Sequence, residues 1–200
     1  METKNRTSKV VIVSGPSGVG KSTICKKVVK RLNNAYLSVS VTTRPKTESE
    51  IDGDDYWFIS NEQFQQRINK GLLLEYAEVF GHLYGTPKDK VEEALQAGKV
   101  VILEIDVQGA IKTKAVYPDA VTIFILPPSA KELAERLNHR GREEGEVAEE
   151  RLNGAGAEIA AAWQHYKHMV INEDLQQAVK ECVQIIENAR VGTYEREKLN

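Results

Sequence analysis

Residues 15–23, Gly15-Pro16-Ser17-Gly18-Val19-Gly20-Lys21-Ser22-Thr23, carry the strongest signal of fold in this chain. They match the pattern G-x-x-x-x-G-K-[ST]; an apolar run at residues 9–14 precedes them, and apolar residues at helical spacing follow them to residue 32. A buried strand, a glycine-rich loop and a helix in this order are the context of a phosphate-binding loop. The sequence therefore predicts that residues 15–23 bind a nucleoside triphosphate.

Each residue type in this loop has a physical role. The glycines let successive backbone N–H groups turn toward one anion, and the positive end of the following helix adds to the attraction. Lys21 can reach the β- and γ-phosphates, and the Ser22 hydroxyl can bind Mg²⁺. An ordinary glycine-rich turn is the alternative, but the strand, the spacing and the Lys-Ser pair together favour the phosphate-binding loop.

Length and composition indicate one globular domain. The chain has 200 residues, of which 41% are hydrophobic and 28% charged. Its 27 lysines and arginines and 29 aspartates and glutamates give a net charge of -2, so no overall positive field would attract nucleic acid. No apolar run is long enough to span a membrane, and Cys25 and Cys182, far apart in the sequence, do not suggest a disulfide framework. We expect a cytoplasmic enzyme without nucleic-acid or membrane partners.

The other apolar runs predict a parallel sheet. Strand patterns occur at residues 35–41, 99–106, 121–126 and 168–172, and helical patterns separate most of them. The run at 99–106 is nearly continuous, which is typical of a strand covered by helices on both faces. Strands that alternate with helices predict an α/β fold, with a parallel core sheet flanked by helices.

Two segments interrupt this alternation. Residues 39–86 predict a mixed α/β insertion. Its patterns indicate a strand at 56–59, a helix at 62–70 capped by Asn61, and a hairpin at 72–85 that turns at Gly81. Thr86 is expected to cap the next helix, with Pro87 at its first position. Residues 140–150 are rich in charge and lack an apolar face, so we predict a mobile element there, with helix resuming at Arg151.

Several motifs, in order and spacing, resemble guanylate kinase over nearly the whole chain. They are Ser38-Val39-Ser40-Val41-Thr42-Thr43-Arg44-Pro45, Gly53-Asp54-Asp55-Tyr56-Trp57-Phe58, Glu75, Tyr84-Gly85-Thr86, Leu103-Glu104-Ile105-Asp106-Val107-Gln108-Gly109, Arg140-Gly141, Arg151-Leu152 and Val170-Ile171-Asn172-Glu173-Asp174-Leu175. The resemblance implies transfer of the γ-phosphoryl group of ATP to GMP, and also to dGMP, giving ADP and GDP with Mg²⁺. It implies one domain at 1–200 with a P-loop core (about 9–37, 87–138 and 157–190), a GMP-binding insertion (about 38–86) and a small mobile lid (about 139–156).

The resemblance also implies the residues that bind GMP, which are Ser40, Arg44, Tyr56, Glu75, Tyr84, Thr86 and Glu104. The Arg44 guanidinium can grip two phosphate oxygens, and hydroxyls can donate to the others. Glu75 and Glu104 match the acids that read guanine, because a carboxylate can accept from its N1–H and N2–H₂ groups, a pair that adenine does not present. Thr86 matches the hydroxyl residue near guanine O6.

Further residues are implied at ATP and at the transferred group. The ATP-binding set is residues 15–23 with Arg136 and Asn172. The catalytic cations are Lys21, Arg44, Arg140 and Arg151. Cations suffice because the transferred phosphoryl group spreads negative charge over its oxygens and needs no protein nucleophile. Ser22 and Asp106 would hold Mg²⁺, partly through water, although a structural role for Asp106 as cap of the next helix is the alternative.

Other interpretations stay open. The family carries a second arginine three residues after the position of Arg44, where this chain has Thr47, so we expect weaker GMP affinity. A guanylate-kinase-like module that binds phosphopeptides without catalysis is one alternative, but such modules tend to lack a working phosphate-binding loop. A ribose bisphosphate kinase of the same fold is another, and it would not need Glu75 and Glu104. The oligomeric state, monomer or homodimer, is not determined by the sequence.

Overall fold

The computed structural model describes residues 8–79, 81–139 and 145–190, without the side chains of residues 137–139 and 145–153. Its core is a parallel sheet in the order β2-β7-β1-β8-β9. The strands are β1 (Lys9–Ser14), β2 (Ala35–Leu37), β7 (Val100–Glu104), β8 (Val121–Leu126) and β9 (His168–Ile171). The predicted α/β fold with a parallel core sheet is confirmed.

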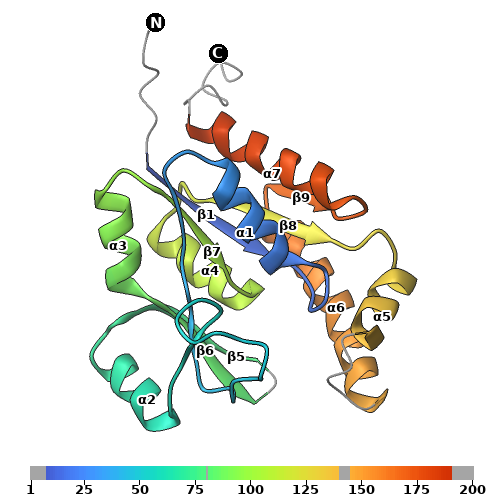
Figure 1. Cartoon of the computed structure of the whole chain (residues 1–200), viewed down its shortest axis with the longest axis horizontal. Coiled ribbons are helices and arrows are strands. Elements are labelled where there is room, and N and C mark those ends of the chain that lie inside the picture. Colours follow the sequence, from blue (N-terminus) through green and yellow to red (C-terminus); the bar gives the residue numbers. More distant parts are fainter. Residues whose placement is uncertain (1–7, 80, 140–144, 191–200) are drawn as a thin grey trace, which may run out of the picture.

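Helices cover both faces of this sheet (Figure 1). On one face α1 (Lys21–Arg31) and α7 (Leu175–Arg190) pack in a cluster with Val11 and Val13 of β1. On the other face α3 (Lys88–Gln96), α4 (Val107–Val116) and α6 (Gly145–His165) pack with Val10 and Ile12. Because successive residues of a strand point to opposite faces, residues 10–13 of β1 are all apolar. α5 (Ala130–His139) packs beside α6.

The insertion forms a second, mixed sheet in the order β4-β3-β6-β5, which extends from one end of the core (Figure 1). Its elements are β3 (Val41–Thr42), β4 (Trp57–Phe58), α2 (Asn61–Asn69), β5 (Leu73–Val79) and β6 (His82–Pro87). β5 and β6 form the predicted hairpin, with Gly81 at a left-handed φ of 74° in the turn. Phe64 of α2 is fully buried, and its ring contacts that of Tyr76 on β5.

Several predicted element ends were wrong. The strand predicted at 35–41 is divided, because β2 pairs with β7 in the core while β3 pairs with β4 and β6 in the insertion. Ser60, not Asn61, caps α2, since its hydroxyl accepts from Gln63 N and the Gln63 side chain accepts from Ser60 N. α6 begins at Gly145 rather than at Arg151, and residues 140–144 of the predicted mobile element lie outside the described residues.

None of the helices in the described ranges is long and apolar enough to cross a bilayer.

Candidate active site at the junction of core and insertion

The phosphate-binding loop joins β1 to α1, as predicted. Gly20 has a φ of 99°, and a Cβ there would lie 2.7 Å from Nδ2 of Asn172, so a side chain would meet both strain and a clash. Lys21 Nζ donates to the carbonyl oxygens of Gly15 (2.6 Å) and Pro16 (2.9 Å), which holds its ammonium group across the loop. The ammonium and the N-terminus of α1 together form a site for an anion.

Asn172, at the end of β9, connects this loop to α5. Its side-chain Nδ2 donates to the backbone carbonyl oxygen of Val19 at 2.8 Å, and its backbone carbonyl oxygen accepts from Nη2 of Arg136 at 3.1 Å. The structure thus brings Arg136 and Asn172, both predicted at ATP, to one side of the loop. Arg140 lies outside the described residues, and the side chain of Arg151 is likewise outside the description.

Two acids lie at the carboxyl end of β7, Glu104 as its last residue and Asp106 just after it, at the edge of the sheet where α/β folds bind ligands. Glu104 Oε1 accepts from the Ser22 hydroxyl at 2.7 Å, across 82 residues of sequence. Asp106 is the N-cap of α4, with Oδ1 accepting from Gly109 N at 2.8 Å. Asp106 therefore has the structural role of a helix cap that the sequence offered as the alternative. Its other carboxylate oxygen, Oδ2, takes no part in the capping bond.

Glu158 of α6 also belongs to this edge, although it was not predicted. Burial raises the pKa of its carboxyl group, the charge of Lys21 lowers it, and the charge of Asp106 raises it further. The charge state of this carboxyl group is therefore coupled to the charges of Lys21 and Asp106. No sequence signal marked Glu158, because it belongs to none of the motifs.

Oxygen donors at this edge suit Mg²⁺. The Ser22 hydroxyl and the carboxylates of Glu104 and Asp106 are hard ligands of the kind that Mg²⁺ prefers. Within the described residues no group of three or more His, Cys, Asp or Glu side chains could hold a metal ion by itself. Phosphate-binding loops instead hold Mg²⁺ through few protein ligands, with substrate phosphates and water completing the shell. The residues present fit that mode of binding.

The phosphate end of the insertion gathers three of the residues predicted to hold GMP. The Arg44 guanidinium carbon lies 5.5 Å from the ring centroid of Tyr56, whose ring meets that of Tyr84 edge to face at 5.8 Å. Hydrogen bonds to Glu50, and after them the charge and hydroxyl of Tyr84, raise the pKa of Arg44 against the effect of burial. Ser40 lies just before β3, and its backbone carbonyl oxygen accepts from Trp57 N of β4 at 2.9 Å. One arginine and two phenols thus share a small region.

The base end of the insertion holds Glu75, which is only 5% exposed. Burial raises its pKa to about 7, although the hydrogen bond from Thr86 opposes this. Thr86 Oγ1 donates to Glu75 Oε1 at 2.6 Å, so Thr86 does not cap α3 as expected; Pro87 occupies the N-cap position. A hydroxyl has one proton, and while it is donated to Glu75 it is not available to guanine O6.

Glycine at position 109 lets α4 approach this acid. A Cβ on Gly109 would lie 2.5 Å from Glu75 Oε2 and 3.1 Å from Asp106 Oδ1. Gly109 was part of a quoted motif, but only the tertiary structure shows that it borders Glu75. The absence of a side chain at position 109 therefore allows the insertion to approach the carboxyl edge of the core sheet.

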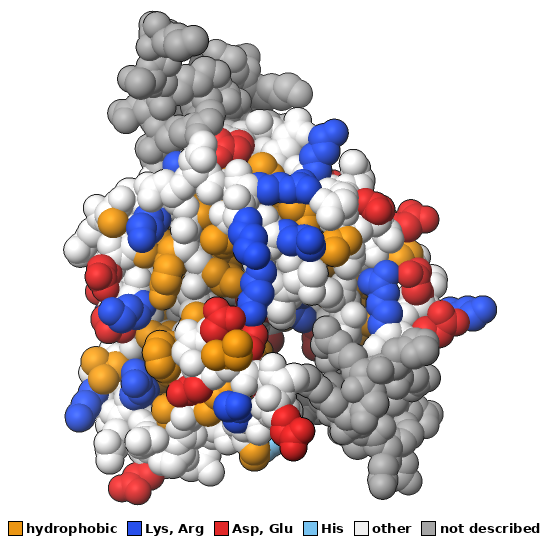
Figure 2. All heavy atoms as spheres, in the orientation of Figure 1, with side chains coloured by type: hydrophobic (Ala, Val, Ile, Leu, Met, Phe, Trp, Pro, Cys, Tyr) orange, Lys and Arg blue, Asp and Glu red, His pale blue; other side chains and the backbone are white. Residues whose placement is uncertain are grey.

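Two further contacts join the insertion to the core. Lys26 of α1 pairs with Asp55 (2.8 Å) and Asp54 (3.3 Å) in the loop before β4. Figure 2 shows Lys and Arg side chains over α1 that meet acidic side chains of the insertion, beside a hollow in this face. Lys112 of α4 donates to the carbonyl oxygen of Tyr76 and lies over its ring. The orientation of the insertion thus depends on contacts from both α1 and α4.

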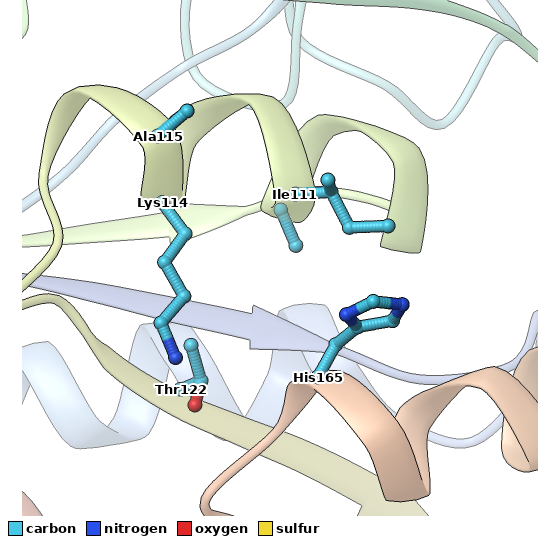
Figure 3. A pocket seen from close by; sticks show the side chains of 6 residues that line it. Ile111, Lys114, Ala115, Thr122 and His165 are labelled. Atoms are coloured by element: carbon cyan, nitrogen blue, oxygen red, sulfur yellow. The ribbon is translucent and has the colours of Figure 1, made fainter.

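A separate pocket lies between α4, β8 and α6. Figure 3 shows Ile111 and His165 facing one another across it, with Lys114 beside Thr122. Its lining contains none of the residues predicted to bind nucleotides. The candidate site is therefore the junction of core and insertion, not this pocket.

Comparison with known proteins agrees with this geometry. The family model described as guanylate kinase matches residues 7–189. A guanylate kinase of Clostridium perfringens is 45% identical over 190 residues, which cover 94% of this chain and 88% of the relative. One of Carboxydothermus hydrogenoformans is 47% identical over 178 residues, covering 88% and 86%. The crystal structure of guanylate kinase from Anaplasma phagocytophilum matches with a TM-score of 0.77 at 32% identity, covering 93% of this chain and 87% of that one. The chain belongs to the guanylate kinase family.

Proposed function

We propose that this chain transfers the γ-phosphoryl group of ATP to GMP, giving ADP and GDP, with dGMP as a second acceptor. The observation that carries the proposal is the position of Glu104 between the two halves of the site. Its carboxylate accepts from Ser22 of the phosphate-binding loop, and its charge, after burial, raises the pKa of Tyr56 in the insertion. A carboxylate that bonds to the loop and acts electrostatically on the insertion supports a site at which the triphosphate and the monophosphate meet.

The reaction needs no protein nucleophile. An oxygen of the GMP phosphate attacks the γ-phosphorus, the bond from that phosphorus to the β,γ-bridging oxygen breaks, and ADP leaves with the electron pair. Phosphate monoesters are largely ionised at neutral pH, so the acceptor also needs no general base. The task of the protein is to align the two nucleotides and to stabilise the negative charge of the transferred group.

At the ATP end, we assign the phosphates to residues 15–23, with Lys21 as the cation nearest to the γ-phosphate. Asn172 bonds to the loop at Val19, and Arg136 bonds in turn to the backbone carbonyl oxygen of Asn172. Ser22 and Asp106 would hold Mg²⁺, in part through water, and when bound the ion would neutralise charge on the β- and γ-phosphates. Glu104 would orient the Ser22 hydroxyl toward the ion.

At the GMP end, Arg44, Tyr56, Tyr84 and Ser40 would hold the phosphate, and Glu75 and Glu104 would accept from N1–H and N2–H₂ of guanine. Glu75 is suited to this because it is buried with a neutral hydroxyl as its partner, and a base with two N–H donors would stabilise its ionised form. We infer that Thr86 orients Glu75; donation to O6 would require that bond to open.

The lid completes the proposal. Arg140 and Arg151 would approach the transferred group when the segment at about 139–156 and the insertion at about 38–86 close over the nucleotides, which would exclude water as a competing acceptor. We further propose a cytoplasmic location with ATP and GMP as the partners and no nucleic acid or membrane, in keeping with the net charge of -2.

A coupled ADP-release assay tests this function, with ATP, Mg²⁺ and each of GMP, dGMP, AMP, CMP and UMP as acceptor. We expect turnover confined to the guanine nucleotides, and a fall of at least about a thousandfold in kcat for Lys21→Ala. Folded protein without turnover on any monophosphate would contradict the proposal. Phosphopeptides and ribose bisphosphate would then be tested, because they are the ligands of the two alternatives.

A further inference from the structure

Arg44 is held by an acid that sequence reasoning did not identify. Its Nη2 donates to Glu50 Oε1 at 2.6 Å and its Nη1 donates to Glu50 Oε2 at 3.1 Å, so the two planar groups meet fork to fork. Their side chains are 21% and 11% exposed, respectively, which shields the pair from most of the solvent. Such bidentate pairs fix the orientation of a guanidinium as well as its position.

Thr47 in turn holds Glu50. Its backbone N and its hydroxyl both donate to Glu50 Oε2, at 2.9 Å and 2.8 Å. Burial disfavours the charge on Glu50, but the bonds from Arg44 and Thr47 outweigh it and lower its pKa to about 2. The carboxylate is therefore ionised and constrained on both oxygens before any ligand binds.

The bonds to Glu50 and Pro45 leave one edge of the guanidinium for an anion or for the Tyr84 hydroxyl, which also raises the pKa of Arg44. Three of its five N–H groups are directed to Glu50 and to the carbonyl oxygen of Pro45. The edge that these bonds do not use consists of Nε–H and the second N–H of Nη2, which are parallel and match two phosphate oxygens. The rings of Tyr56 and Phe58, with centroids 5.5 Å and 5.6 Å from the guanidinium carbon, pack beside the group.

We propose that Glu50, oriented by Thr47, is a positioning residue that presents this edge of Arg44 to the phosphate of GMP. The inference rests on the proposed role of Arg44 in binding that phosphate. It runs against simple charge repulsion, because a carboxylate so close to the site should weaken the binding of an anion. Removal of the Glu50 charge therefore separates the two effects by sign: lost positioning weakens GMP binding, and lost repulsion strengthens it.

The test compares GMP with guanosine, which lacks the phosphate, by isothermal titration calorimetry on the full chain. The variants are Glu50→Gln, Thr47→Val, Arg44→Ala and the double variant Arg44→Ala/Glu50→Gln. Glu48→Gln is the matched control, because it removes the same charge from an exposed position two residues away. Steady-state KM values for ATP and GMP complete the set.

We expect Glu50→Gln to weaken GMP binding about tenfold and Thr47→Val by a smaller factor, with guanosine affinity and the KM for ATP unchanged. In the Arg44→Ala background, Glu50→Gln should have no further effect, since the two residues act as one unit. Unchanged or tighter GMP binding in Glu50→Gln, while Arg44→Ala weakens it, would overturn the inference but not the proposed function. An equal loss in Glu48→Gln would also overturn it. If Arg44→Ala itself leaves GMP affinity unchanged, the proposed role of Arg44 fails first.

Discussion

Glu50 at the phosphate end of the insertion and Glu75 at its base end are both shielded acids, yet their pKa values are shifted in opposite directions. Burial opposes the charge of each. At Glu50 the bonds from Arg44 and Thr47 outweigh burial and lower the pKa to about 2. At Glu75 the neutral hydroxyl of Thr86 does not outweigh it, and the pKa is raised to about 7. Glu75 is the more deeply buried and has a neutral partner, whereas Glu50 has a cation and two further donors; partner and burial together decide the charge state.

The different charge states of Glu50 and Glu75 suit different roles, to hold a side chain in place and to recognise a ligand. A permanently ionised Glu50 can hold an arginine in one orientation at any pH at which the protein functions. Glu75 is poised between two charge states near neutral pH, so N–H donors of a ligand can favour the ionised form and be selected by it. The phosphate end is thus built before binding, whereas the base end is completed by the ligand.

The largest expected effect concerns the base end. Glu75→Gln should lower kcat/KM for GMP about a hundredfold or more, because an amide offers one acceptor and adds a donor that faces the N–H groups of guanine. The ADP-release assay measures this, and the KM for ATP should not change. Glu78→Gln on the same strand, at an exposed position, is the control. Equal kcat/KM in Glu75→Gln and wild type would remove Glu75 from guanine recognition.

The next prediction concerns stability as a function of pH. Glu75 has an ordinary pKa of 4.5 when unfolded and about 7 when folded, so the native state binds more protons and stability falls as pH rises from 4.5 to 7. The pKa of Glu50 is lowered from 4.5 to about 2 on folding, so its contribution to stability is lost as pH falls from 4.5 to 2. The window spans ~3–4 kcal/mol at most for Glu75 and less for Glu50, whose charge is screened more by solvent.

Urea unfolding at a series of pH values tests these opposite slopes. The difference in free energy of unfolding between wild type and Glu75→Gln should change with pH only above pH 4.5. The corresponding difference for Glu50→Gln should change only below pH 4.5. The contributions of the other acidic residues are the same in wild type and variant and cancel in each difference. Two parallel difference curves would show that the partners of these glutamates do not set their charge states.

A smaller effect on GMP binding is expected from a substitution at Gly109, where α4 of the core approaches Glu75. Gly109→Ala would place a methyl group 2.5 Å from the present position of Glu75 Oε2, and the carboxylate is the group that can move. We expect the KM for GMP to rise several-fold, at unchanged KM for ATP. Stability should change little, since alanine in a helix gains up to about 1 kcal/mol over glycine. A large loss of stability with an unchanged KM would mean that the helix moves instead of Glu75.

The smallest effect concerns the contact between α1 and the phosphate end. Lys26→Met removes the pairs with Asp54 and Asp55, in which the lysine is 41% exposed, so the loss should be about 0.2–1 kcal/mol. The measurement is the denaturation midpoint at low and high salt, with Lys30→Met on the same helix as control. A salt-insensitive loss would indicate that packing of the lysine stem, rather than its charge, holds the insertion.

Local patterns were sufficient for much of the molecule. The phosphate-binding loop, the parallel strands and the β5–β6 hairpin were predicted because each depends on residues close together in the sequence, through glycine conformation, apolar runs or turn chemistry. The quoted motifs were sufficient to indicate the family, which the comparisons confirmed. Even so, the division of residues 35–41 between two sheets was missed, because a two-residue strand such as β3 has no periodicity of its own.

The charge state and the partner of each acid were decided only by the tertiary structure. Glu104 meets Ser22 across 82 residues. Glu75 meets Thr86 across the β5–β6 hairpin and borders Gly109 of α4, and the charge of Lys21 acts on Glu158 of α6. Even the nearby pair of Arg44 and Glu50 follows from an irregular loop that no sequence period describes. The sequence by itself determined which chemical groups are present and the order of the elements that carry them. Their pairing depends on distance and burial in space, which no spacing along the chain specifies.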